Sequence, residues 1–408
     1  MRVLFTTSAS SGHFHPLVPL AQALTDAGHE VAFAGPGSFA PTVEALGYQH
    51  FAAGYDPADG VDTELGGLWA ELETLRPGPE AGEFAGAEVM EFYWAKLSSG
   101  YMVRRMVPDL IPVLHLWQPD LVVRELYEVG GAVAAEAVGL PHAAVQVGHL
   151  IDGSWLRRDA SRELDPIRQS VGLPADPELA MLYRHLLLSF VPPSYQDPNN
   201  AIPTQRHLRT IVFDRSGAET APSWLHTDLP RPVIYATFGT VTHFNAFPDL
   251  FRATIAGLRN VAGTLIVTVG RDRDPAALGP QPDHVRVERY VPQSLLFPHC
   301  DLVVHHGGHN TTLAAVAAGL PQVVIPLGAD QPANARRCEE LGLGVALWPA
   351  ERTSAAIEAS ARHVLAEPRF RHNAARLRQE MAALPGPAHA VELLEQLVAS
   401  HRPAVAVS

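Results

Sequence analysis

Residues 301–319 read DLVVHHGGHNTTLAAVAAG, which predicts a short strand, a turn of two glycines and an apolar helix in direct succession. The paired glycines let the backbone approach a ligand closely, and the first N–H groups of the helix have no partner within it. Such a helix start favours an anion, above all a phosphate. We therefore predict a phosphate site in this turn, completed by the imidazole of His306 and the hydroxyl of Thr311 or Thr312.

A metal centre and a purely structural turn are the two alternatives for this segment. Imidazole and thiolate bind zinc, and the candidate ligands are Cys300, His305, His306 and His309. Adjacent histidines that leave a strand point to opposite faces, and no second ligand pair at zinc spacing follows, so a closed shell of four ligands is hard to assemble. The glycines alone could instead serve tight packing. We favour the phosphate site and expect no metal.

Strand and helix patterns alternate on both sides of this segment. The first unit has Val3–Thr6 as a strand, Pro16–Ala27 as a helix and Val31–Ala34 as the next strand. In the second half, apolar runs predict further strands at 233–237, 264–269, 285–287 and 322–325. Such alternation is typical of doubly wound parallel sheets. The sequence thus predicts an α/β protein with two Rossmann-like domains in series.

A polar stretch rich in proline and glycine, Phe213–Pro232, separates the two patterns. We therefore predict an N-terminal domain over 1–215, a linker over 216–231 and a C-terminal domain over 232–385. The last predicted helix lies within 386–408 and is long enough to cross back toward the N-terminal domain.

The composition limits the partners of the chain. A net charge of −13 over 408 residues argues against nucleic acid and anionic membranes, since both bind basic surfaces. No apolar run approaches the ~20 residues that span a bilayer, and the apolar start is too short for a secretory signal. The two cysteines, Cys300 and Cys338, cannot form a disulfide framework and fit a reducing compartment. We expect a cytoplasmic protein with small-molecule partners, and a homodimer is left open.

A loop with two histidines follows the first predicted strand. Thr7–Pro16 lacks the G-x-G-x-x-G of nicotinamide and flavin enzymes, which counts against an oxidoreductase. His13 and His15 lie in this loop at the carboxyl end of a strand, where open parallel sheets bind ligands. An imidazole there can remove a proton from a bound molecule. A histidine that only bonds local backbone is the alternative.

Two carboxylates flank the predicted strand Leu121–Val123 and are candidate partners for such a histidine. A carboxylate beside the ring would orient it and stabilise the imidazolium. Asp120 precedes the strand, whereas Glu125 follows it and lies at the ligand-binding edge. We favour Glu125 over Asp120. A solvated glutamate paired with Arg124 is the alternative interpretation.

Three more loops reach the ligand-binding edge of the second predicted sheet. The adjacent carboxylate and carboxamide of Asp330 and Gln331 can bridge neighbouring hydroxyls of a sugar, although such a pair also caps helices. The other two loops are Phe238–Thr240 and Arg289–Gln293.

Aromatic residues gather in 53–101 and 151–194, where the alternation of strands and helices is lost. They either wall an apolar pocket or belong to ordinary helical core. The residues in question are Trp69, Phe84, Phe92, Tyr93, Trp94, Trp155 and Tyr183.

As a set, in order and spacing over nearly the whole chain, these segments resemble glycosyltransferase family 1 of the GT-B fold. The likeness is greatest to bacterial enzymes that glycosylate macrolides, enediynes and aromatic natural products. The similar motifs are Gly12-His13-x-x-Pro16, Pro119-Asp120-Leu121-Val122-Val123-x-Glu125, Tyr290-Val291-Pro292-Gln293, His306-Gly307-Gly308-x-Asn310-Thr311 and Asp330-Gln331. The resemblance implies two Rossmann-like domains that face a central cleft.

The resemblance also assigns roles to single residues. It makes His13 the catalytic base, with His15 as a neighbour and Glu125 as the matching acid. It implies that the nucleoside binds Tyr290, Val291 and Gln293, and that the donor sugar binds Asp330 and Gln331. It implies a donor diphosphate site of Gly239, Thr240, His306, Gly307, Gly308, Asn310 and Thr311.

The activity implied by the resemblance is an inverting transfer that needs no metal and no cofactor. A sugar moves from a dTDP-linked donor, which is a substrate, to a hydroxyl of an apolar natural-product aglycone. A UDP-linked donor is the alternative. A sugar-nucleotide epimerase of the same fold, a catalytically silent nucleotide-sugar-binding protein and a zinc enzyme are the alternative functions. Transfer to an added aglycone separates the transferase from the epimerase. A silent binding protein would not need His13, and a zinc enzyme would contain stoichiometric metal.

Overall fold

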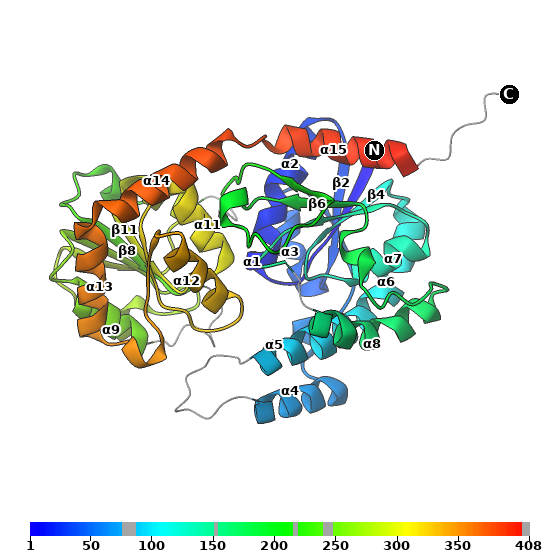
Figure 1. The fold of residues 1–408 in the computed structure, drawn as a ribbon, viewed down its shortest axis with the longest axis horizontal. Helices are drawn as coiled ribbons and strands as arrows, with labels where there is room; N and C mark the ends of the chain where they lie inside the picture. Colours follow the sequence, from blue (N-terminus) through cyan, green and yellow to red (C-terminus); the bar gives the residue numbers. More distant parts are fainter. Residues whose placement is uncertain (76–86, 151–153, 215–218, 240–247, 402–408) are drawn as a thin grey trace. The chain divides into compact units, whose positions relative to one another are not determined.

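The computed structural model describes residues 1–75, 87–150, 154–214, 219–239 and 248–401 (Figure 1). The chain divides into two compact units. Unit 1 comprises the described residues of Met1–Arg76, Gly86–Gly217 and Leu384–Ser408, and unit 2 those of Ala218–Ala383. Each unit has one parallel sheet with helices packed on it. The prediction of an α/β chain with doubly wound parallel sheets is confirmed.

The sheet of unit 1 has the strand order β3-β2-β1-β4-β5-β6-β7, and every neighbouring pair is parallel. Its strands are β1 (Arg2–Thr6), β2 (Glu30–Gly35), β3 (Gln49–Ala52), β4 (Leu121–Glu125), β5 (His142–Val145), β6 (Leu186–Ser189) and β7 (Gln205–His207). In the register of the first pair of central strands, Val3 lies opposite Leu121. The carboxyl ends of β1 and β4 therefore meet at one edge of the sheet.

The sheet of unit 2 has the order β10-β9-β8-β11-β12-β13 and is again parallel throughout. Its strands are β8 (Val233–Thr237), β9 (Thr264–Thr268), β10 (Val285–Glu288), β11 (Leu302–His305), β12 (Gln322–Val324) and β13 (Gly344–Ala346). The two central strands β8 and β11 end at Thr237 and His305, which pair in the register. The glycine turn that follows β11 thus starts beside the loop that follows β8.

The helices of unit 1 are α1 (Ser11–Phe14), α2 (Val18–Asp26), α3 (Ala40–Glu44), α4 (Thr63–Leu75), α5 (Ala87–Phe92), the π-helix Tyr93–Tyr101, α6 (Met102–Trp117), α7 (Gly130–Ala137), α8 (Ser154–Ser170) and α15 (Pro387–His401). Those of unit 2 are α9 (Asp249–Leu258), α10 (Gln293–Leu296), α11 (His309–Ala318), α12 (Gln331–Glu340), α13 (Ser354–Ala366) and α14 (Pro368–Ala383). No helix among the described residues is long and apolar enough to cross a membrane.

The alternation of side chains along β1 builds two core layers in unit 1. Val3 and Phe5 pack with α2 and with α15, whereas Leu4 packs on the other face with α6 and α7. Helix α15 follows α14 of unit 2 but belongs to the core of unit 1, because Leu394 is fully buried against β1 and α2. The backbone N–H of Arg209 also donates to the carbonyl of Pro385 at 2.7 Å.

The helix predicted to begin at Pro16 begins earlier in the structure. The N–H groups of His13 and Phe14 both donate to the carbonyl of Ser10 at 3.0 Å, so the chain turns helical from Ser11 onward. A 3₁₀ turn, His15–Leu17, then joins α1 to α2. The predicted start is therefore wrong, and His13 lies in a helical turn rather than in an open loop.

Candidate active site

His13 and Glu125 lie side by side at the carboxyl edge of the first sheet. His13 belongs to α1, just after β1, and Glu125 is the last residue of β4. Its Oε1 lies 3.0 Å from Nδ1 of His13. The Glu125 side chain is only 1% exposed, while that of His13 is 33% exposed. The carboxylate is thus enclosed behind a histidine that opens to solvent.

The loop after β4 fixes the Glu125 carboxylate. Its second oxygen, Oε2, accepts a hydrogen bond from the backbone N–H of Tyr127 at 2.7 Å. The fully buried guanidinium of Arg124 donates to the carbonyls of Leu126 at 2.8 Å and Leu182 at 2.6 Å. Arg124 therefore holds the backbone around Glu125, and Glu125 is not the solvated residue of the alternative interpretation.

Asp120 lies at the other end of β4. Its Oδ2 accepts from the backbone N–H of Arg2 at 2.8 Å, where β1 begins. The intervening strand of five residues is about 16 Å long at ~3.3 Å per residue. Asp120 therefore cannot reach His13, and the structure brings only Glu125 to it.

An aromatic residue that the sequence analysis missed lies beside the pair. The ring of Tyr127 is 6.0 Å from that of His13 and 4.7 Å from that of Trp94, which belongs to the π-helix. Its hydroxyl donates to the carbonyl of His149 at 2.8 Å. Its position two residues after Glu125, in a loop at the ligand-binding edge, is the signal that could have identified it.

The aromatic residues singled out in the sequence differ in their exposure. Phe92 and Trp94 are buried, whereas Trp69 and Tyr93 are 39% and 43% exposed. Phe84 and the side chain of Trp155 lie outside the described residues.

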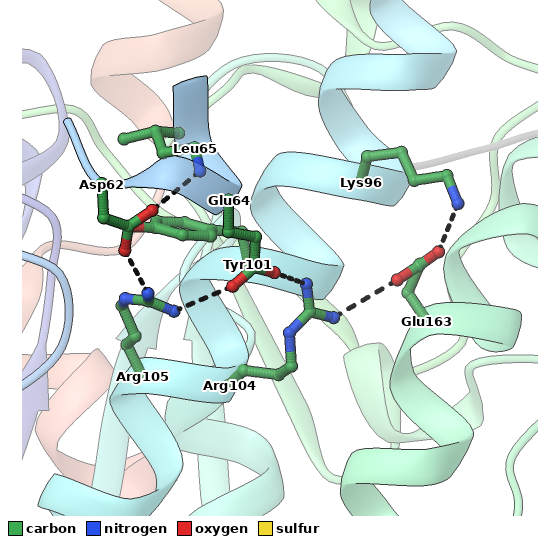
Figure 2. A network of polar contacts seen from close by, with 8 residues as sticks. All are labelled: Asp62, Glu64, Leu65, Lys96, Tyr101, Arg104, Arg105 and Glu163. Atoms are coloured by element: carbon green, nitrogen blue, oxygen red, sulfur yellow. Dashed lines mark hydrogen bonds and ion pairs between the residues drawn. The ribbon is translucent and has the colours of Figure 1, made fainter. Parts of the chain in front are cut away.

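A polar network joins helices of unit 1 that lie between β3 and β4 and between β5 and β6 along the chain (Figure 2). The guanidinium of Arg104 in α6 contacts Glu64 of α4 at 2.5 Å and Glu163 of α8 at 3.3 Å. Lys96 of the π-helix also contacts Glu163, at 2.6 Å. Arg105 pairs with Asp62 just before α4. Helices α4 and α8 are thereby fastened to α6, and the π-helix is fastened to α8.

A pocket of about 390 Å³ lies beside this network, between α6 and the loop after β3. Its lining combines tyrosines with charged residues: Gly54, Tyr55, Asp56, Asp59, Gly60, Asp62, Tyr101, Arg104, Arg105, Pro108 and Asp109. This pocket therefore combines aromatic surface with charged groups of both signs.

The imidazole of His306 in unit 2 is enclosed by glycines. A β-carbon at Gly239 or at Gly308 would collide with the Nε2 edge of the ring. Burial and the neighbouring His305 lower the pKa of His306 to about 3. The ring is therefore neutral in the free protein at physiological pH. Gly308 is the N-cap of α11 and has no side chain to bond the first-turn N–H groups.

A hydrogen bond joins the predicted nucleoside and diphosphate segments. Nε2 of Gln293 donates to Oγ1 of Thr311 at 3.2 Å. The guanidinium of Arg271 lies 3.9 Å over the ring of Tyr290 and covers one of its faces. Val291 is buried, and Thr240 lies outside the described residues.

Comparison with known proteins identifies the family of this chain. Residues 22–239 match the family model of the N-terminal domain of erythromycin biosynthesis protein CIII-like proteins, and residues 252–397 match that of the C-terminal domain. The chain belongs to this family. The predicted resemblance to natural-product glycosyltransferases is thereby confirmed.

Relatives of this EryCIII-like chain span its whole length. It is 30% identical to the TDP-daunosamine transferase DnrS of Streptomyces peucetius, with 98% of each chain covered. It is 31% identical to the 10-deoxymethynolide desosaminyltransferase of Streptomyces venezuelae, again with 98% of each covered. The solved structure of glycosyltransferase VinC in complex with DTDP is 27% identical with a TM-score of 0.78, over 98% of this chain and 100% of that one. These likenesses and the two parallel sheets confirm the GT-B fold.

Both members of the sugar-binding pair predicted for this EryCIII-like chain accept hydrogen bonds from within unit 2. Oε1 of Gln331 accepts from the backbone N–H groups of Leu327 and Gly328 at 2.7 and 3.1 Å, so this oxygen holds its own loop. Oδ2 of Asp330 accepts from Nδ2 of Asn334 at 3.0 Å.

Asn334 was missed by the sequence analysis, although it is 1% exposed and joins two predicted sites. Its Nδ2 also donates to the carbonyl of Gly307 at 2.9 Å. The spacing of four residues from Asp330, one turn along α12, is the signal that could have revealed it.

Two of the candidate zinc ligands, His305 and Cys300, already make other hydrogen bonds. Nε2 of His305 lies 2.8 Å from Oε1 of Gln322, and Nδ1 accepts from the N–H of Gly307 at 3.1 Å. The thiol of Cys300 donates to the carbonyl of Leu296 at 3.3 Å. Within the described residues, no group of three or more His, Cys, Asp or Glu is placed to hold a metal ion.

Proposed function

We propose that this EryCIII-like chain is an inverting glycosyltransferase that moves a deoxysugar from a dTDP-linked donor to a hydroxyl of an apolar natural-product aglycone. The observation that carries the proposal is the 3.0 Å contact between a buried Glu125 and a partly exposed His13. The names of the relatives support the substrate classes, because they refer to TDP-daunosamine and to 10-deoxymethynolide. The solved relative that holds DTDP supports the nucleotide.

In this mechanism His13 acts as the general base. Glu125 holds the proton on Nδ1, so Nε2 is free of hydrogen and takes the proton from the acceptor hydroxyl. The acceptor oxygen forms a bond to the anomeric carbon as the bond from that carbon to the diphosphate oxygen breaks. Attack from the face opposite the leaving group inverts the configuration. The carboxylate of Glu125 stabilises the imidazolium that results.

The departing diphosphate is stabilised by dipoles of the protein. The first-turn N–H groups of α11 and its macrodipole favour an anion, and the ring of His306 supplies a neutral N–H donor. We propose that these donors make a metal ion and a further cofactor unnecessary, because they act where negative charge develops.

The test is a screen of the purified full-length chain against dTDP- and UDP-sugars with macrolide and aromatic polyketide aglycones. We expect a glycosylated product by mass spectrometry, with inverted anomeric configuration by NMR coupling constants. The Asp120→Asn variant serves as an active control. Conversion of the donor sugar without any aglycone would point to the epimerase instead. Product formation with retained configuration would refute the single displacement.

A further inference from the structure

The peptide units around Gly307 are held from two sides. The N–H of Gly307 donates to Nδ1 of His305 at 3.1 Å, and its carbonyl accepts from Nδ2 of Asn334 at 2.9 Å. Gly307 has a φ of +85°, a conformation that favours glycine. Its α-carbon also has no room for a side chain, because a β-carbon would lie 2.8 Å from Cγ1 of Val324.

The hydrogen bonds of His305 determine which of its ring nitrogens carries the proton. A backbone N–H can only donate, so Nδ1 is without hydrogen and the proton resides on Nε2. Nε2 therefore donates to Oε1 of Gln322 at 2.8 Å. Both side chains are fully buried, and burial lowers the pKa of His305 to about 4. The ring is thus a neutral bridge between β12 and the glycine turn over the whole physiological pH range.

Asn334 forms a second bridge on the opposite side of Gly307. Its Nδ2 group contacts the Gly307 carbonyl and Oδ2 of Asp330, the residue proposed to bind the donor sugar. A continuous chain of hydrogen bonds therefore runs from the sheet through the turn to the sugar pair. Its members are Gln322, His305, Gly307, Asn334 and Asp330.

Gly307 directly precedes Gly308, the N-cap of α11, so its orientation sets where the first N–H groups of the helix point. We propose that His305 and Asn334 are positioning residues for the donor diphosphate, which hold the Gly307 turn so that the start of α11 faces the phosphates. The proposal rests on the function proposed above. It assigns both residues a role in donor affinity through the turn, without contact to the donor.

Two substitutions of His305 separate this role from a contribution to stability alone. The amide oxygen of asparagine lies two bonds from Cβ, as Nδ1 does, and can accept from Gly307. The amide nitrogen of glutamine lies three bonds from Cβ, as Nε2 does, and can donate to Gln322. Each variant keeps one buried hydrogen bond and loses the other. The melting temperatures of the two variants should therefore fall by similar amounts.

The experiment compares dTDP with thymidine on the full chain. Calorimetry measures the Kd of dTDP, and ligand-observed NMR measures that of thymidine, which has no phosphate. We expect His305→Gln to weaken dTDP binding about tenfold, since the Gly307 N–H loses its acceptor, and His305→Asn to bind dTDP nearly as tightly as wild type. Thymidine affinity should be unchanged in both variants. Equal dTDP affinity in the two variants, or an equal loss for thymidine, would overturn the proposal.

Asn334→Ala provides a second test with a matched control. Asn373 makes the same kind of contact in unit 2, from Nδ2 to the carbonyl of Gly342 at 3.1 Å. Asn334→Ala should raise the Kd of dTDP about tenfold, while Asn373→Ala should leave it unchanged. Equal effects of the two would refute the positioning role. A wild-type chain that does not bind dTDP at all would instead refute the donor in the proposed function.

Discussion

The two histidines of the proposed reaction, His13 in unit 1 and His306 in unit 2, have opposite surroundings. His13 is 33% exposed and has a buried carboxylate 3.0 Å away. His306 is enclosed by glycines beside His305, and burial lowers its pKa to about 3. A neighbouring carboxylate favours the imidazolium, whereas burial and a second imidazole disfavour it. The same side chain is thus suited to accept a proton in one unit and to remain a neutral donor in the other.

Removal of the base should have the largest effect on turnover. General-base assistance contributes on the order of 100- to 10,000-fold, so His13→Ala should lower kcat within that range and leave the Kd of dTDP unchanged. Initial rates and calorimetry measure the two quantities. His29→Ala is the matched control, because Nε2 of His29 also lies 3.0 Å from a glutamate, Glu395. A similar loss in both variants would show that His13 is not the base.

Replacement of the carboxylate should give the next largest effect. Glu125→Gln removes the charge that stabilises the imidazolium, so we expect kcat to fall roughly 100-fold with little change in donor affinity. The double variant with His13→Ala should lose far less than the product of the two single losses, because the residues act as a unit. Asp120→Asn, at the other end of β4, should retain nearly full activity. Additive losses at His13 and Glu125 would mean that the pair does not act together.

Donor binding should depend on His306 rather than on the pair in unit 1. His306→Ala removes a hydrogen bond to a charged group, which should raise the Kd of dTDP on the order of 10- to 100-fold. The ratio of the variant's Kd to that of wild type should be flat from pH 6 to 8, since the ring loses its proton near pH 3 in the free protein. A cationic His306 would instead make this ratio grow as the pH falls. Calorimetry at several pH values decides between the two.

The smallest expected effect is at Thr311. Its Oγ1 accepts from Nε2 of Gln293, so Thr311→Ala removes one neutral hydrogen bond between the predicted nucleoside and diphosphate segments. We expect the Kd of dTDP to rise about fivefold and kcat to change little. Thr353→Ala, which removes only the N-cap of α13, is the control. An affinity loss as large as that of His306→Ala would contradict this ranking, because it would mean that Thr311 contributes as much to donor binding as His306 does.

The sequence by itself determined the architecture and the order of the loops. Fully buried parallel strands require continuous apolar runs, and such runs at 302–304 and 121–123 identified β11 and β4 directly. A fixed strand direction then placed Glu125 at the ligand-binding edge and Asp120 at the opposite edge. These conclusions depend on local pattern and chain direction, which a sequence contains.

Tertiary structure alone decided the partners and charge states of the polar groups. The enclosure of His306 by Gly239, the Gln322 contact that sets the tautomer of His305, and the bond from Asn334 to Gly307 all join residues from different elements. Likewise, Arg124 reaches Leu182 across 58 positions. Burial and hydrogen bonding depend on distances of a few ångströms between segments far apart along the chain, and the local pattern of side chains does not encode these distances.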